Sequence, residues 1–150
     1  VAAMLIFILK NSKLEVAVSG VDADKVTDKG VSGDHTGTRV IYLSGPLFFG
    51  TQDILTLKLQ EIGKASAIVL SMRGVPNIDD SAINELDMIH RELKQKSVNM
   101  VFCGVCRTVM GKMEQAGFVE KIGSGHFYWD AVEALKGIEG TEELRQHRIW

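Results

Sequence analysis

The sequence predicts a single α/β domain with a mostly parallel central sheet of about four or five strands and about four packed helices. Short apolar runs rich in β-branched residues, such as 67–72, are typical of strands buried on both faces. Between such runs, apolar residues recur at spacings of three and four, as over 82–93, which indicates helices packed on one side. Because strands and helices alternate, right-handed crossovers should gather the strands into one sheet.

The composition fits one globular core and excludes one class of partner. The chain has 150 residues, 45% of them hydrophobic, and a formal net charge of −2. No basic stripe is present, so nucleic acid is not an expected partner. Cys103 and Cys106 have a C-x-x-C spacing, but Cys103 ends an apolar strand pattern and no second cysteine pair exists. Two free thiols are favoured over a redox or metal site.

The first 38 residues fall into two parts. Residues 1–9 are apolar and lead into Lys10 and Lys13, as at the cytoplasmic exit of a membrane helix, although a full span needs roughly 20 residues. An edge strand or a buried helix of the same domain is the alternative. The later residues are rich in Gly, Asp, Ser and Thr without a sustained period. The expected division is an apolar end and linker over 1–15, a linker or loop over 16–38, the folded domain over 39–138 and a helical tail over 139–150.

The folded domain should begin with a strand over 39–44, which a Gly-Pro pair closes because proline lacks an amide proton. Residues 47–49 are then a second short strand or a continuation past a bulge. Thr51 can cap a helix that Gly63 ends. Its predicted apolar face consists of Ile54, Leu55, Leu57, Leu59 and Ile62.

The rest of the domain repeats this plan. The predicted elements are, in order, a strand over 67–72, a helix to residue 96, a strand over 98–105, a helix over 107–116, a short strand over 118–122 and a closing helix from residue 129 to 135 or as far as 148.

The corner at residues 77–83 joins a buried strand to a helix and collects polar groups. Asp79 and Asp80 stand at the amino end of the helix, where free amide protons favour carboxylates, so either can be the cap. Two adjacent carboxylates would repel a phosphate, and neighbouring turn residues diverge too much for an acid–base dyad. Asp79, Asp80 and Ser81 are therefore either a cap with a tight turn or a polar surface that a protein partner recognises.

The next strand-to-helix corner has the opposite chemistry. Cys106, Arg107 and Thr108 bring an arginine and a hydroxyl without a carboxylate, so this corner is a candidate site for an anion or a nucleotide phosphate, with a plain capped helix as the alternative. A candidate partner contact is the segment Leu47, Phe48 and Phe49. Side chains alternate along a strand, so one of the two phenylalanines would point outward. The alternative is that these residues belong to the core.

Catalysis, a cofactor and a metal are not expected. The four histidines have no metal-ligand spacing, and His90 falls on the polar side of its helix, where it should be solvated. No nucleotide-binding loop and no nucleophile motif is present.

Three segments together resemble the STAS domain, a family shared by sulfate transporters and anti-sigma factor antagonists. They are VIYLSGPLFFGT at 40–51, IDDSA at 78–82, and GHF at 125–127 followed by DAVEAL at 130–135. The resemblance covers about 38–137 and is greater to the carboxyl-terminal STAS domain of bacterial SulP-type anion transporters than to the antagonists. The first 13 residues are similar to the end of the last membrane helix and the linker of such transporters.

The resemblance implies a non-catalytic regulatory and assembly domain on the cytoplasmic face of the inner, or plasma, membrane. Its parent would be a secondary transporter of the sulfate, bicarbonate or dicarboxylate class. The implied partners are the membrane domain of the same transporter and a second copy, with a soluble regulatory protein or a nucleotide as further candidates. The alternative is a free-standing anti-sigma factor antagonist, in which a kinase phosphorylates a corner serine. Asp80 stands where that serine would be, and Ser81 remains as a hydroxyl.

Overall fold

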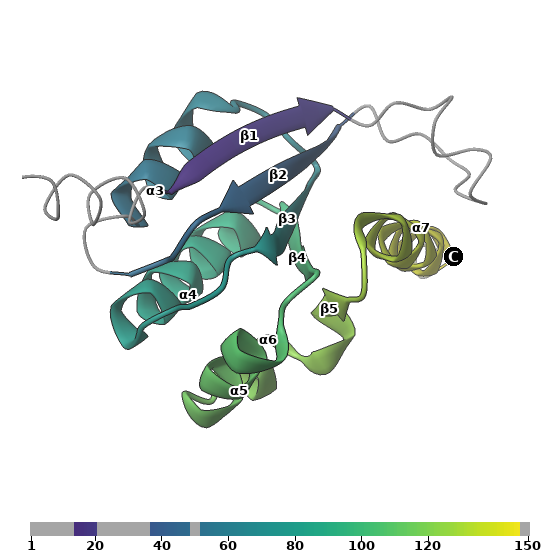
Figure 1. The fold of residues 1–150 in the computed structure, drawn as a ribbon. Helices are drawn as coiled ribbons and strands as arrows, with labels where there is room; N and C mark the ends of the chain where they lie inside the picture. The colour runs from purple at the N-terminus through teal and green to yellow at the C-terminus, as the bar shows by residue number, and fades with distance from the viewer. Residues whose placement is uncertain (1–13, 21–36, 49–51, 148–150) are drawn as a thin grey trace, which may run out of the picture.

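The computed structural model describes residues 14–20, 37–48 and 52–147, and Figure 1 shows their arrangement. Five strands form one sheet in the order β1-β2-β3-β4-β5. They are β1 (Glu15–Gly20), β2 (Thr38–Ser44), β3 (Ala67–Gly74), β4 (Asn99–Cys103) and β5 (Phe127–Tyr128). Strand β1 runs antiparallel to β2, and the other neighbouring pairs are parallel. The predicted mostly parallel sheet is therefore confirmed.

Helices cover both faces of this sheet. They are α3 (Gln52–Glu61), α4 (Asp80–Gln95), α5 (Arg107–Gln115), α6 (Phe118–Ile122) and α7 (Ala131–His147), with a 3-10 turn, η1, at Ser124–His126. In Figure 1, α3 and α4 lie on one side of the sheet and α7 on the other.

The alternation of side chains along the strands produces two cores. On the α3 and α4 side, Leu70 and Phe102 are fully buried in the larger cluster, together with Leu86 of α4. On the other side, Val69 and its neighbours pack against Leu135 of α7 in a smaller cluster. The central strands are apolar throughout because each of their faces is covered.

Residues 118–122 form the helix α6, so the strand predicted there is wrong. Phe118 and Ile122 are both buried, and a spacing of four residues puts them on one face of a helical turn. The edge position belongs instead to β5, where Phe127 pairs with Phe102 and Tyr128 with Cys103. A two-residue strand is too short to produce an alternating pattern that sequence inspection could recognise.

The beginning of the predicted loop over 16–38 also differs, because Glu15–Gly20 forms β1. Its residues pair with β2 in an unbroken antiparallel register from Glu15 opposite Ser44 to Gly20 opposite Arg39. Of the residues in β1, only Val16 packs against the main core, and Val18 is 41% exposed. Because this edge strand buries so little surface, it was not recognised from the apolar pattern of the sequence. The predicted membrane-helix end over 1–13 lies outside the described residues.

Helix α3 differs from its predicted packing. Gly63, with φ of 71°, follows the helix as expected, and Thr51 lies outside the described residues. Leu55 is buried, but Ile54 and Leu57 are 36% and 60% exposed, so only part of the predicted apolar face is covered. The helix lies over the β1 edge, which leaves its outer side uncovered.

The closing helix takes the longer of its two predicted extents. Helix α7 continues to His147, so the predicted tail over 139–150 is continuous with the closing helix as far as it is described.

Within the part of the chain that the structure describes, none of the helices combines the length and the apolar composition that a bilayer crossing requires.

Candidate functional site

The polar corner between β3 and α4 is held in place by the segment that follows β2. The amide of Leu47 donates to the carbonyl oxygen of Asn77 at 3.0 Å, and the amide of Asp79 donates to the carbonyl oxygen of Leu47 at 3.1 Å. These bonds make a parallel bridge between Leu47 and Ile78. Leu47 is 1% exposed and belongs to the main core, so it is not the partner contact that the sequence suggested. Phe48 is half-buried, and residue 49 lies outside the described residues.

Asp79 is the cap of α4. Its Oδ1 accepts a hydrogen bond from the amide of Ala82 at 2.9 Å, and its backbone is extended, with φ of −110° and ψ of 173°. This geometry satisfies one of the amides at the start of the helix that has no partner within it. The cap predicted for this corner is confirmed and falls on the first of the two aspartates.

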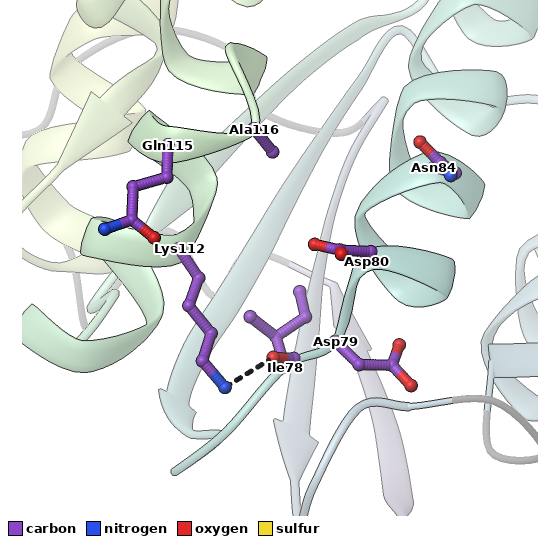
Figure 2. Close-up of a pocket in the computed structure, with 7 residues that line it drawn as sticks. All are labelled: Ile78, Asp79, Asp80, Asn84, Lys112, Gln115 and Ala116. Carbon is purple, nitrogen blue, oxygen red and sulfur yellow. Dashed lines mark hydrogen bonds between the residues drawn. The ribbon is translucent and has the colours of Figure 1, made fainter.

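Asp80 has a different environment, although it is the adjacent residue. It is exposed, and among the described residues its carboxylate has no hydrogen bond or ion pair. Figure 2 shows the carboxylate of Asp80 directed across the gap toward α5, whereas that of Asp79 points away from the gap. The two carboxylates therefore diverge, as expected for adjacent turn residues, and that of Asp80 faces α5.

The gap beside Asp80 is a groove of about 720 Å³ between the start of α4 and α5, here called the α4–α5 groove (Figure 2). The residues that line it are Ile78, Asp79, Asp80, Asn84, Lys112, Gln115 and Ala116. Ser81 is exposed but does not line the groove. Carboxylate, amide and ammonium groups thus face one another across an open surface, which suits the recognition of a polar protein segment.

Lys112 forms the far wall of the groove, and sequence inspection missed it. Its Nζ donates to Oδ1 of Asn77 at 2.6 Å and to the carbonyl oxygen of Ile78 at 3.1 Å, so it ties α5 to the corner. The only sequence signal was its position on the polar side of a predicted helix. Partners 34 and 35 residues away cannot be inferred from that position.

The second predicted corner lies in a separate cavity. Cys106 and Arg107 line this cavity, whereas Thr108 is exposed on α5 and does not line it. Both cysteines are free. Cys103 is buried, and burial raises the pKa of its thiol. Cys106 is half-buried, with Sγ 3.7 Å from the carbonyl oxygen of Val75.

His90 is half-buried, so its predicted solvation is wrong. Its ring meets that of His126 edge to face, with centroids 6.1 Å apart and planes at 87°. Burial lowers the pKa of His90, the electrostatic effects of His126 and Lys94 lower it further, and Asp87 opposes them. Among the described residues, no three His, Cys, Asp or Glu side chains are grouped so that they could hold a metal ion.

Comparison with known proteins identifies the family. Residues 31–134 match the family model described as the STAS domain, which is more than half of the chain. The fold, the capped corner after β3 and this match agree, and the chain belongs to the STAS domain family.

The relatives found by sequence are plant sulfate transporters. Sulfate transporter 3.2 of Arabidopsis thaliana is 28% identical over 113 residues, which is 67% of this chain and 18% of that protein. Low affinity sulfate transporter 3 of Stylosanthes hamata is 30% identical over 73 residues, which is 49% of this chain and 11% of that protein. The chain thus spans less than a fifth of the length of these curated relatives.

Solved structures share the fold. A sulfate transporter family protein from Wolinella succinogenes superposes with a TM-score of 0.67 at 24% identity, covering 82% of this chain and 99% of that chain. The murine Solute Carrier 26 family member A9 anion transporter superposes with a TM-score of 0.72 at 14% identity, covering 92% of this chain and 24% of that one. The same fold therefore occurs both as a separate chain and within a much longer transporter chain.

Proposed function

We propose that this chain is the cytoplasmic regulatory and assembly domain of a SulP-type secondary anion transporter, of the sulfate, bicarbonate or dicarboxylate class. It acts through protein contacts and carries out no chemistry of its own. Its location is the cytoplasmic face of the inner, or plasma, membrane, and its partners are the membrane domain of the same transporter and a second copy of itself. The sulfate transporters among its relatives support this proposal over other STAS functions.

The environment of Asp80 is the observation that carries the proposal. Asp79 is occupied in capping α4, while Asp80 directs into the α4–α5 groove a carboxylate that pairs with none of the described residues. Unlike a phosphorylatable serine, this carboxylate supplies a negative charge that no kinase has to add. A permanently charged groove favours a constitutive contact with a polar segment that presents a Lys or Arg to Asp80.

Ser81 supports a second candidate, a free-standing partner-switching antagonist. Its hydroxyl is exposed one residue beyond Asp80 and is accessible to a kinase. This candidate predicts phosphate on Ser81 after incubation with kinases from the same cell. If mass spectrometry finds none, the transporter proposal remains and the antagonist does not.

The reading frame that encodes Val1 tests the transporter proposal directly. We expect several apolar spans of roughly 20 residues to precede Val1, and we expect the full-length product to sediment with membranes. A frame without such spans, whose product stays in the soluble fraction, would rule out the proposal.

A further inference from the structure

A second cavity, of about 420 Å³, opens where the parallel strands β3, β4 and β5 end. Arg73 lies at the end of β3, residues 104–106 follow β4, Tyr128 and Trp129 close β5, and Arg107 begins α5. The cavity shares no lining residue with the α4–α5 groove. Ligands of open α/β sheets usually bind at this carboxyl edge.

Backbone contacts hold the walls of this cavity together. The amide of Gly104 donates to the carbonyl oxygen of Tyr128 at 3.1 Å, and Nη2 of Arg73 donates to the carbonyl oxygen of Trp129 at 3.3 Å. Gly104 has φ of 67°, and a Cβ added there would lie 3.0 Å from Cβ of Arg73, so glycine lets the two strand ends approach. Contacts within the chain thus hold the cavity walls in place, which reduces the ordering that binding requires.

The side chains that line the cavity carry positive charge. Arg73 and Arg107 line it, and no carboxylate does. Arg107 is exposed and makes no hydrogen bond or ion pair with another described residue. By contrast, Arg91 and Lys121 elsewhere on the surface both pair with Asp87. Guanidinium groups bind phosphate and carboxylate through paired hydrogen bonds, so an anionic group fits between these arginines.

Trp129 adds a flat apolar surface beside the two arginines. It is 81% exposed, the most exposed of the large apolar side chains that the structure describes. Indole rings stack on flat rings and interact with cations, and small-molecule sites typically combine an aromatic wall with a few convergent polar groups.

We propose that this cavity binds a small molecule in which a flat ring carries a phosphate or carboxylate group. The ring stacks on Trp129, and the anionic group bonds to Arg107 and Arg73. The proposal concerns a surface apart from the α4–α5 groove, so it does not depend on how Asp80 recognises a partner.

Tryptophan fluorescence provides the test, because the chain contains only two tryptophans. The Trp150→Phe variant of the chain leaves Trp129 as the single reporter. It is titrated with AMP, which has a ring and a phosphate, and with benzoate, which has a ring and a carboxylate. Adenosine and inorganic phosphate each supply one half of the proposed ligand.

We expect saturable quenching by AMP or benzoate, and the tighter of the two identifies the preferred anionic group. Arg107→Gln in the same background should weaken binding by about tenfold or more. Lys64→Gln removes an exposed positive charge elsewhere and should leave binding unchanged. Circular dichroism checks that each variant is folded.

Three results would each overturn the proposal. The first is that neither AMP nor benzoate quenches the fluorescence of Trp129. The second is that adenosine or inorganic phosphate binds as tightly as the better of these two ligands, and the third is that the Arg107→Gln variant binds as tightly as its parent.

Discussion

Nζ of Lys112 lies 2.6 Å from Oδ1 of Asn77, which connects the middle of α5 to the loop that leads into α4. The same ammonium group also donates to the carbonyl oxygen of Ile78, a buried residue at the base of the α4–α5 groove. One side chain therefore joins the two walls of the groove.

Replacing Lys112 by Met should lower the free energy of unfolding by about 1 kcal/mol, because two hydrogen bonds between separate elements are lost. Lys96→Met is the matched control, since Glu92, one turn away on an exposed helix face, is the only ion-pair partner of Lys96 among the described residues. That change should cost less than about 0.5 kcal/mol. Urea denaturation measures both, and equal losses would show that Lys112 is an ordinary surface lysine.

Substitutions at the two aspartates of the corner should have different effects, one on stability and the other on partner binding. Asp79→Ala removes the cap of α4 and should cost about 1 kcal/mol, whereas Asp79→Asn keeps the accepting oxygen and should restore most of this stability. Asp80→Ser should change stability by no more than about 0.5 kcal/mol and should alter partner binding instead. A loss of several kcal/mol for Asp80→Ser with unchanged binding would make Asp80 a structural residue only.

Two glycines in helices should respond oppositely to alanine. A Cβ added to Gly137 in α7 would overlap the phenol ring of Tyr128, while one added to Gly111 in α5 meets nothing within 4 Å. Gly137→Ala should therefore destabilise by about 1–3 kcal/mol despite the helix propensity of alanine, and Gly111→Ala should stabilise by about 0.5–1 kcal/mol. Thermal unfolding compares them, and a stabilising Gly137→Ala would show that α7 does not pack closely on Tyr128.

The half-buried contact between His90 and His126 predicts a loss of stability in acid. Burial holds the pKa of His90 below its usual value of 6.5, and the electrostatic effects of His126 and Lys94 act in the same direction, against the pull of Asp87. The folded state thus favours the neutral ring, so this contribution is complete above pH 6.5 and is lost as the pH falls from 6.5 through the lowered pKa.

Urea denaturation between pH 7.5 and pH 5 tests this prediction, and His90→Gln should flatten that part of the pH profile. An identical profile for His90→Gln and the parent chain would assign the acid sensitivity to other groups.

The sequence predicted the parts of the fold that depend on local patterns. The strand at 67–72 and the helix to residue 96 follow from continuous apolar composition and from spacings of three and four, and Asp79 follows from the chemistry of a helix start. The features that it missed depend on neighbours in space. Strand β1 exists because β2 offers it a pairing edge, and α6 is too short to display a period.

The candidate site was predicted in part for the same reason. Asp80 and Arg107 could be identified because they stand at strand-to-helix corners, which sequence patterns locate. Their surroundings could not, since Lys112 reaches the first corner from another helix and Arg73 and Trp129 reach the second from β3 and from the residue after β5. Arg73 directly follows the apolar run of β3. Because the ends of neighbouring parallel strands meet at one edge of the sheet, the sequence contained the information needed to place Arg73 near Arg107.

Anion uptake by the full-length parent protein tests the role of Asp80 most directly. Asp80→Arg reverses the charge in the α4–α5 groove, and Asp53→Arg makes the same change in the first turn of α3, outside that groove. With equal amounts of each variant in the membrane, we predict that sulfate, bicarbonate or dicarboxylate uptake falls at least about tenfold for Asp80→Arg and is unchanged for Asp53→Arg. Equal uptake by both variants and the parent would contradict the proposal that this corner regulates a transporter.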